Sequence, residues 1–162
     1  MIANIRSATA ADVPIILDFI LQLADYEKLA HECVATEAKL HASLFGERPA
    51  AEVVIAEYDN IPCGFALFFT SYSTFLAQPG LYLEDLFVHP NSRGHGIGRQ
   101  LMQHLAQLAV SRGYGRFEWS VLDWNTPAIS FYRSLGAQPM KEWTVQRLVG
   151  DALISLASSA SQ

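Results

Sequence analysis

Residues 81–111 of the chain, LYLEDLFVHPNSRGHGIGRQLMQHLAQLAVS, decide the fold. The apolar run at residues 81–89 predicts a strand, and leucines at helical spacing predict a helix over residues 97–111. Arg93-Gly94-His95-Gly96-Ile97-Gly98 stands between them. Glycines let a ligand approach the backbone closely, and the free N–H groups at a helix N-terminus favour phosphate oxygens. The stretch therefore predicts a pyrophosphate-binding loop.

The charge distribution supports an anion site at this loop. The 162 residues carry 11 Lys and Arg against 16 Asp and Glu, a formal net charge of −5. This balance argues against a general nucleic-acid or membrane-surface binder, which needs clustered Lys and Arg. No acidic residue lies between Asp85 and Glu118, yet this segment holds Arg93, Arg99, Arg112 and Arg116.

Two other phosphate-binding motifs fit the glycines less well. A Walker loop requires a Lys directly after its glycines, and none follows here. A dinucleotide fingerprint places its third glycine differently and follows a strand of a parallel βαβ unit. The strands that precede this loop instead have the pattern of an antiparallel meander.

The remaining sequence predicts one α/β domain over residues 1–162, with a mixed central sheet flanked by helices. The expected order is β-α-α-β-β-β-α-β-α-β, and the tail at about 151–162 is expected to fray. Thr9 and Asp12 have capping-box spacing, and Thr36 caps the second helix. After the short first strand, the predicted helices cover about 12–24, 36–45, 97–111 and 126–135, and the later strands cover 53–56, 65–69, 81–89, 116–122 and 143–149.

The two cysteines, Cys33 and Cys63, form no C-x-x-C pattern, which favours a reducing compartment. The N-terminus lacks the layout of a signal peptide, and no apolar run reaches the ~20 residues of a membrane span. We therefore expect a cytoplasmic protein. The five histidines show no ligand spacing, so no metal site is expected.

With the strand, Arg93-x-x-Gly96-x-Gly98 and the helix in this order, the chain resembles the GCN5-related N-acetyltransferase (GNAT) family. Further blocks are similar to the diamine (spermidine/spermine) and thialysine acetyltransferases of that family. The similarity covers about residues 2–148, although the loop at 136–143 is shorter and the turn at 59–60 lacks an insertion. The blocks are IRSATAAD at 5–12, ADYEK at 24–28, YLEDLFV at 82–88, LDWN at 122–125 and Phe131-Tyr132.

The resemblance implies an acetyl-CoA site and a homodimer. It implies that the backbone at Leu86, Phe87 and Val88 holds the pantetheine arm, and that Tyr132 lies beside the thioester sulfur. The residues implied at the pyrophosphate are Arg93, Gly94, His95, Gly96, Ile97, Gly98 and Arg99, and those on the far side of acetyl-CoA are Asn125, Thr126, Pro127 and Ala128.

Acetyl transfer to an amine requires a base, because an alkyl amine with a pKa of about 10.4 is protonated at neutral pH. Glu84 is the candidate base, acting directly or through water. It lies in an apolar strand, where adjacent Glu84 and Asp85 are expected on opposite faces, and Asp85 is the one more expected to have a structural role. Tyr132 is the candidate acid for the leaving thiolate. The alternatives are a Glu84 paired with an arginine and a Tyr132 that only packs in the core.

Acidic and aromatic side chains attract ammonium groups, so several of them are candidates for the acceptor site. Glu27 has the alternative of a solvated helix end, and Trp119 that of an ordinary core residue. The candidate acceptor-binding residues are Tyr26, Glu27, Glu84, Glu118, Trp119 and Ser120.

The sequence thus predicts an N-acetyltransferase that moves an acetyl group from acetyl-CoA to the primary amine of a small cationic acceptor. A polyamine, a diamine and a thialysine-like lysine analogue all fit. Cys63 has no obvious His partner, which favours direct attack in a ternary complex over an acetyl-cysteine. The alternatives are a CoA-binding regulatory module without turnover and a protein or peptide N-acetyltransferase.

Overall fold

The computed structural model describes residues 2–158, and its contacts divide the chain after Leu122 into two compact units. The first unit holds the sheet and three of the helices. Its strands are β1 (Asn4–Ser7), β2 (Glu52–Tyr58), β3 (Ile61–Ser73), β4 (Gln78–Val88) and β5 (Phe117–Trp119). Its helices are α1 (Val13–Tyr26), α2 (Glu37–Phe45) and α3 (Ile97–Ser111), with the 3-10 turns η1 (Ala10–Asp12), η2 (Ala30–Glu32) and η3 (Pro90–Ser92).

The five strands form one mixed sheet in the order β1-β2-β3-β4-β5. The first four are antiparallel neighbours, and only β4 and β5 run parallel, joined through α3. This architecture confirms the predicted α/β class with its mixed sheet. It also confirms the antiparallel meander in front of the glycine loop.

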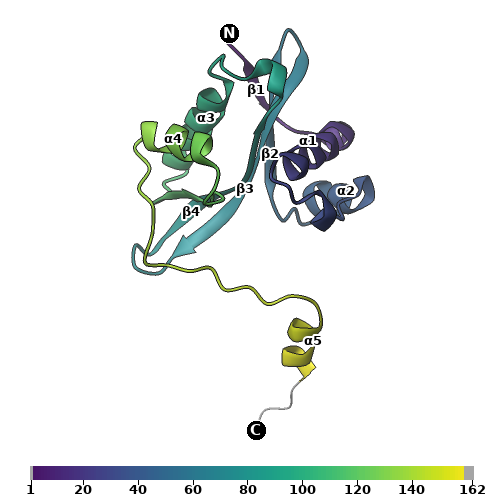
Figure 1. Cartoon of the computed structure of the whole chain (residues 1–162), viewed down its shortest axis with the longest axis vertical. Coiled ribbons are helices and arrows are strands. Elements are labelled where there is room, and N and C mark those ends of the chain that lie inside the picture. The colour runs from purple at the N-terminus through teal and green to yellow at the C-terminus, as the bar shows by residue number, and fades with distance from the viewer. Residues whose placement is uncertain (1, 159–162) are drawn as a thin grey trace. The chain divides into compact units, whose positions relative to one another are not determined.

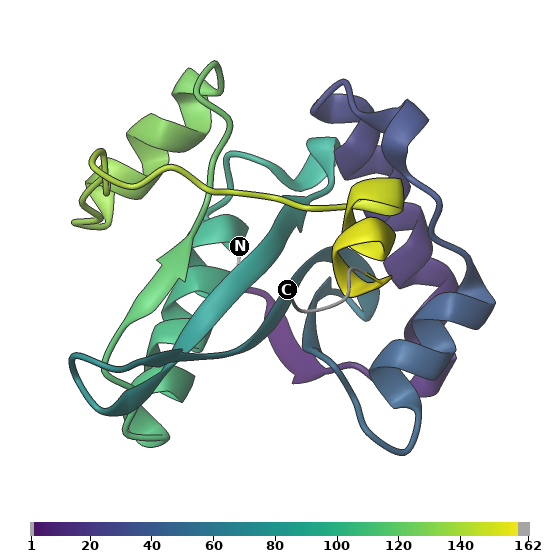
Figure 2. The same cartoon turned by 90° about the horizontal axis from the view of Figure 1, so that it is seen from below.

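Helices cover both faces of this sheet (Figure 1). The α1 and α2 helices lie side by side on one face, and α3 lies on the other (Figure 2). Phe19 of α1 packs between Phe65 and Phe87, with ring centroids 5.7 and 5.3 Å away. On the other face, Leu101 and Leu105 of α3 are fully buried. The strands β2, β3 and β4 therefore supply side chains to two hydrophobic layers.

A β-bulge at Glu84 changes the phase of β4. Asp85 pairs with Leu67 and Leu83 pairs with Phe68, so Glu84 is the extra residue in the ladder. Paired residues share a face, so Leu83 joins Phe68 on the α3 face, whereas Asp85 joins Leu67 on the α1 face. An expectation based on unbroken alternation could not assign these directions.

An ion-pair network fixes the N-terminal part of the first unit. The Arg6 guanidinium donates to both carboxylate oxygens of Asp12 at 2.8 Å and to Glu57 at 2.8 Å. Asp12 also accepts the backbone N–H of Thr9 at 2.7 Å, as the capping-box spacing predicts. The network thus ties β1 and β2 to the start of α1.

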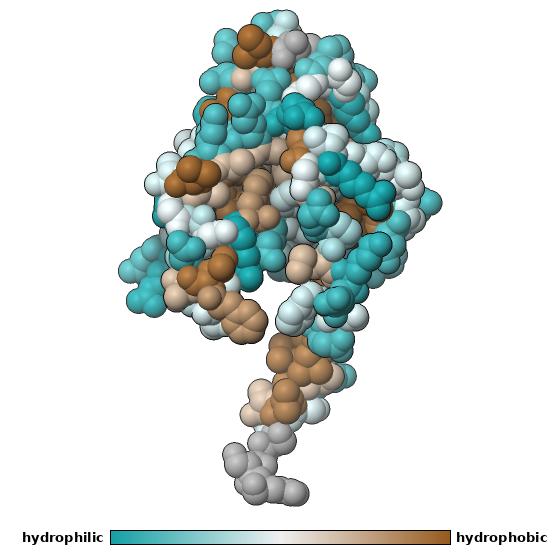
Figure 3. Space-filling view, turned by 90° about the vertical axis from the view of Figure 1, so that its left-hand side faces the viewer, coloured by the Kyte–Doolittle hydropathy of each residue, from teal (hydrophilic) through white to brown (hydrophobic). Residues whose placement is uncertain are grey.

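The second unit contains α4 (Thr126–Ser134) and α5 (Gly150–Ser158). The strand predicted at 143–149 is wrong: within the described residues this segment joins no ladder, and a strand needs a partner for its backbone groups. The fraying expected at about 151–162 stays a prediction: residues 151–158 are helical, and residues 159–162 lie outside the described part. Apolar side chains, including Leu153, Ile154 and Leu156, are exposed along α5 (Figure 3).

Candidate active site

The glycine loop has the geometry expected of a phosphate-binding turn. Gly94 and Gly96 have φ values of +77° and +80°, which side chains of L-residues rarely adopt. Gly96 caps α3, and the first intrahelical bond is the 3.0 Å bond from the Gln100 N–H to the Gly96 carbonyl. The preceding amides at 97–99 therefore lack intrahelical acceptors, so the start of α3 can receive an anion.

The side chains of this loop divide into an anchor and an exposed set. Ile97 is 1% exposed and fixes the first turn of α3 in the core. Its predicted contact with acetyl-CoA can therefore involve only its backbone. His95, Gly98 and Arg99 are partly or fully accessible, and a Cβ added at Gly94 would meet no atom within 4 Å. The loop thus has open space on its ligand side.

Arg93 connects this loop to α1 as well as to β4. Its Nε–H donates to the Val88 carbonyl at 2.9 Å. Its guanidinium carbon lies 5.1 Å from the ring centroid of Tyr26 and 5.8 Å from that of Phe87. Arg93 therefore orders the loop through protein contacts, in addition to any contact with an anion.

The β4 and β5 strands separate next to this loop. Their ladder consists of Leu81 with Phe117, Tyr82 with Glu118 and Leu83 with Trp119, and the strands then diverge (Figure 2). Beyond Leu83, the β5-side edge of β4 has no ladder partner in β5. Phe87 buries its ring in the core, so at this position β4 can offer a ligand only its backbone groups. The geometry suits the pantetheine contact predicted at residues 86–88.

Three carboxylates gather near the bulge and the end of α1. Asp85 is half-buried, and burial, followed by the charges of Glu84 and Glu27, raises its pKa to about 6. Glu27 follows directly after α1, and burial raises its pKa as well. Glu84 is exposed. We call Glu27, Glu84 and Asp85 the acid cluster; it concentrates negative charge where part of that charge is poorly solvated.

Asp85 is the member of the acid cluster that sequence reasoning undervalued. Leu81, Leu83 and Phe87 are all buried, and in the sequence they follow one alternation that would place them on one face. The structure places Leu81 and Leu83 on the α3 face and Phe87 on the α1 face, because the bulge at Glu84 changes the phase of the strand. Alternation in the sequence does not reveal this bulge, so it could not identify Asp85.

The other predicted acceptor residues have protein partners. Glu118 pairs with Arg116 at 2.6 Å, so its charge is already balanced. Ser120 and the Tyr82 hydroxyl are hydrogen-bonded at 2.9 Å, and the Trp119 ring packs on Phe117 with centroids 4.9 Å apart. Of these contacts, the hydrogen bond between Tyr82 and Ser120 joins the end of β5 to β4, and the other two lie within residues 116–119.

Two of the four arginines that give this segment its positive charge form salt bridges within the protein. Arg112 makes a bidentate pair with Glu52, with both distances 2.7 Å. Arg116 is paired with Glu118, as described above. Arg93 and Arg99 stand at the loop itself, and their contact with an anion stays a prediction.

The remaining predicted residues lie on α4, in the second unit. The Asn125 side chain caps this helix by accepting the Ala128 N–H at 3.3 Å, and Thr126 and Pro127 form its first turn. Tyr132 is half-buried, with its ring centroid 5.3 Å from that of Phe131. The roles of these residues toward acetyl-CoA and its sulfur stay predictions.

Cys63 is not an activated thiol. It is buried, its Sγ donates to the Ala56 carbonyl at 3.3 Å, and burial raises its pKa. A thiol in this state is a poor nucleophile at neutral pH. Across residues 2–158, no three His, Cys, Asp or Glu side chains are grouped to hold a metal ion, and none of the helices there is long and apolar enough to span a membrane.

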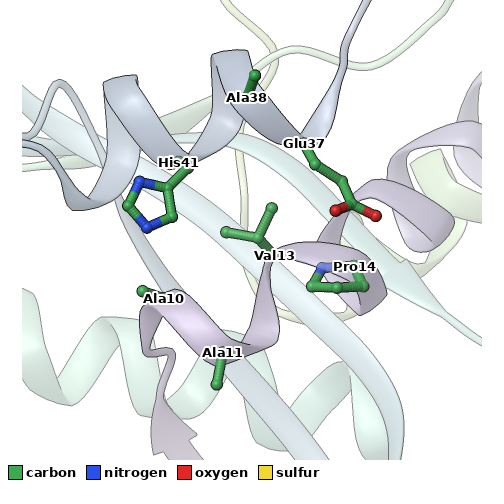
Figure 4. A pocket seen from close by; sticks show the side chains of 7 residues that line it. All are labelled: Ala10, Ala11, Val13, Pro14, Glu37, Ala38 and His41. Carbon is green, nitrogen blue, oxygen red and sulfur yellow. The ribbon is translucent and has the colours of Figure 1, made fainter.

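An open cavity of about 430 Å³ lies between the starts of α1 and α2 (Figure 4). Val13 and Pro14 form part of its apolar wall, and Glu37 and His41 stand on the α2 side. Tyr26 and Glu27 lie at the other end of α1. The cavity therefore includes no residue of the predicted site.

Comparison with known proteins identifies the class. The model of the acetyltransferase (GNAT) family matches residues 20–137, and the chain belongs to this family. It is 37% identical to the L-ornithine N5-acetyltransferase of Arabidopsis thaliana, over 94% of this chain and 87% of that protein. It is also 37% identical to the thialysine N-epsilon-acetyltransferase of Mus musculus, over 95% of this chain and 96% of that protein.

A solved structure shares the fold over nearly the full length. An integron cassette protein from the mobile metagenome of V. cholerae superposes with a TM-score of 0.82 and 29% identity, covering 98% of this chain and 99% of that one. The protein is thus an acetyl-CoA-dependent N-acetyltransferase. The loop at 93–99 and the free edge of β4 are consistent with acetyl-CoA as its co-substrate.

Proposed function

We propose that the enzyme transfers the acetyl group of acetyl-CoA to the primary amine of a small cationic acceptor, by direct attack in a ternary complex. The acceptor class comprises diamines, polyamines and lysine analogues such as thialysine. Both relatives compared above are named for acetylation of amino-acid side-chain amines. Acceptors of this class carry at least one ammonium group at neutral pH.

The acid cluster is the observation that carries this proposal. The acid cluster of Glu27, Glu84 and Asp85 lies near the free edge of β4. Within the described residues, none of its three carboxylates forms a salt bridge with a cationic side chain. An approaching ammonium group would relieve the mutual repulsion of these carboxylates. It would therefore be attracted to the edge where the thioester is expected. A neutral acceptor would gain nothing from this charge.

The acid cluster also provides the proton acceptor that the chemistry requires. The ammonium must lose a proton before its nitrogen can attack the thioester carbonyl. Glu84 remains the predicted base, acting directly or through water, and Asp85 is a second candidate because a pKa of about 6 matches catalysis near neutral pH. Tyr132 is proposed to protonate the departing thiolate. Each transfer forms one amide bond and releases CoA and one proton.

Direct attack is supported by the state of Cys63. An acetyl-cysteine route needs a thiolate with access to the thioester, and Cys63 is buried with a raised pKa. We further propose a cytoplasmic homodimer that acts on small molecules, without a nucleic-acid or membrane partner. The family match at 20–137 extends across both units, which supports one transferase domain.

The proposal is tested by the initial rate of CoA release from acetyl-CoA with spermidine, a short diamine, thialysine, ornithine, lysine and an amine-blocked control. Saturable release confined to free amines is the expected result. Asp85→Asn and Glu84→Gln should lower kcat/KM for the amine, by about 100-fold for whichever residue is the base. Glu47→Gln, an exposed carboxylate outside the acid cluster, is the matched control.

Three results would contradict the proposal or one of its parts. Binding of acetyl-CoA without CoA release for any amine would favour a binding module. Release with a peptide N-terminus but with none of the small amines would favour a protein acetyltransferase. Full activity in both acid-cluster variants would remove the proposed role of these carboxylates.

A further inference from the structure

The face of the sheet that carries Asp85 continues onto β5. Tyr82 pairs with Glu118 and stacks on Phe69, with ring centroids 5.1 Å apart, so Glu118 lies on the same face as Phe69. Phe69 is two residues along β3 from Leu67, the ladder partner of Asp85. Side chains two residues apart in a strand point to the same side. Glu118 and Asp85 therefore face the same side of the sheet.

Arg116 and Glu118 form a pair of opposite charges on this face. Arg116 comes two residues before Glu118, and its Nε lies 2.6 Å from the Glu118 Oε1. The side chains are 41% and 37% exposed, so a ligand in solution can reach both charges. A guanidinium has five N–H donors, and one carboxylate occupies at most two of them in a bidentate pair. Arg116 therefore retains donors for a second carboxylate.

The absence of a side chain at Gly80 gives the stem of Arg116 its place on the sheet. A Cβ at Gly80 would lie 3.1 Å from the Arg116 Cγ and 2.8 Å from the Ser71 Oγ. Any larger residue at position 80 would thus displace Arg116. The Ser71 Oγ is also buried, with no hydrogen-bond partner among the described residues. A carboxylate drawn to Arg116 is an acceptor of the kind that this hydroxyl lacks.

The distance between this charge pair and the acid cluster suits a short amino acid. Asp85 and Glu118 are separated by two ladder steps, about 7 Å along the strands, and by one strand spacing of about 5 Å. The side-chain nitrogen of ornithine or lysine lies about 5–6 Å from its Cα. With a hydrogen bond of about 3 Å at each end, such a molecule spans the interval. Its side-chain ammonium then lies at the acid cluster and its α-groups lie at Arg116 and Glu118.

From these observations we propose that Arg116 selects α-amino acids with a side-chain amine as acceptors, by binding their α-carboxylate while Glu118 binds their α-ammonium. This inference rests on the proposed acetyl transfer and specifies its acceptor class. A preformed pair of opposite charges complements both α-groups of an amino acid. A diamine offers a second ammonium in place of the carboxylate, and Arg116 repels it. The pair therefore favours an amino acid over the diamine of the same length.

The test compares acceptors that differ only in the α-carboxylate: ornithine with 1,4-diaminobutane, and lysine with 1,5-diaminopentane. Initial rates of CoA release should give wild type a kcat/KM at least about tenfold higher for the amino acid of each pair. Arg116→Gln should lower kcat/KM for ornithine by about tenfold or more, chiefly through KM, because Arg116 contacts the acceptor away from the reacting atoms. The same variant should leave kcat/KM for 1,4-diaminobutane unchanged or raise it, because Glu118 is then free to bind the second ammonium.

Two further variants separate recognition from a general effect of the substitution. Arg112→Gln loses a salt bridge with Glu52 at the end of α3, on the other face of the sheet, and should leave both acceptors unchanged. Arg116→Lys keeps the charge and should recover part of the KM for ornithine. Turnover of 1,4-diaminobutane by Arg116→Gln, together with its thermal midpoint, shows that this variant is folded.

The outcomes distinguish this inference from the proposed function. Equal kcat/KM for ornithine and 1,4-diaminobutane in wild type would overturn the inference and leave the proposed acetyl transfer intact, and this comparison needs no variant. An equal loss for both acceptors in a folded Arg116→Gln would have the same meaning. Absence of CoA release with every free amine would instead overturn the proposed function, and the inference with it.

Discussion

The guanidinium of Arg93 lies 5.1 Å from the ring centroid of Tyr26, so the loop before α3 is held against the last residue of α1. Glu27 of the acid cluster follows Tyr26 directly. One side chain therefore connects the predicted pyrophosphate loop with the predicted acceptor site. Ordering one of them should help to order the other.

We predict that Arg93→Lys raises KM for both acetyl-CoA and the amine. Lysine keeps the positive charge, but it loses the planar contact with Tyr26 and the hydrogen bond from Nε to Val88. The stacking contact is worth about 1 kcal/mol, which corresponds to about fivefold in KM. Steady-state kinetics with each substrate varied in turn measures this effect. Arg48→Lys is the control, and a rise in KM for acetyl-CoA alone would show that Arg93 serves only the cofactor loop.

We predict that Asp85→Asn stabilises the fold at pH 7 while it lowers activity. The folded protein holds the Asp85 proton up to a pH of about 6, whereas the unfolded chain releases it near 4. The free energy of unfolding therefore rises as the pH falls from about 6 to about 4. At neutral pH the ionised Asp85 carboxylate lowers the free energy of unfolding by about 2 kcal/mol, and Asn, which carries no charge, avoids this loss. Urea unfolding at pH 7 and at pH 4 measures the difference between variant and wild type, which should vanish at the lower pH. Equal stability at both pH values would contradict a destabilised Asp85 carboxylate.

We predict that Asp12→Asn destabilises the protein at pH 7. Hydrogen bonds from Arg6 hold the pKa of Asp12 down at about 2, so this stabilisation is present above pH 4 and is lost as the pH falls toward 2. Arg6 is 35% exposed and solvent screens the pair, which limits the loss to about 1 kcal/mol. Urea unfolding between pH 7 and pH 2 checks this window. Asp18→Asn, on the exposed face of α1, should change little, and a pH-independent loss in Asp12→Asn would indicate that the cap matters more than the charge.

We predict that Tyr132→Phe lowers kcat by about 100-fold and changes the KM for acetyl-CoA by less than about twofold, because only the phenolic proton is removed. Initial rates over a range of acetyl-CoA concentrations separate the two constants. Ser130→Ala, on the same helix, is the control for changes in α4. An unchanged kcat would leave Tyr132 with a packing role only.

The sequence predicted those parts of the fold that local signals determine. Thr36 caps α2, the helix at Ile97–Ser111 has the predicted bounds, and Asn60 ends the turn before β3. The glycines at 94 and 96 have the left-handed backbone that their turn requires. Each of these features depends on a few residues that are neighbours in the chain, so a single sequence is enough to predict it.

Features that depend on distant partners were less predictable. The alternating segment at 143–149 had a strand pattern but found no ladder partner in the described structure. Glu84 was expected inside a regular strand, and the bulge leaves it exposed while Asp85 becomes the less solvated acid. Each outcome depends on which strand lies beside the residue, and local propensity does not contain that information.

The bulge allows β4 to carry one extra residue without losing its register. Leu83 pairs with Phe68 and Asp85 with Leu67, which are consecutive in β3, so the ladder is in phase on both sides of Glu84. Removing Glu84 would join Leu83 directly to Asp85 and leave both pairs as they are. Phe87 would stay in the aromatic cluster of Phe19 and Phe65. A single codon deletion here would thus remove one carboxylate of the acid cluster without turning over the strand, and position 84 is where the residue count of β4 can change.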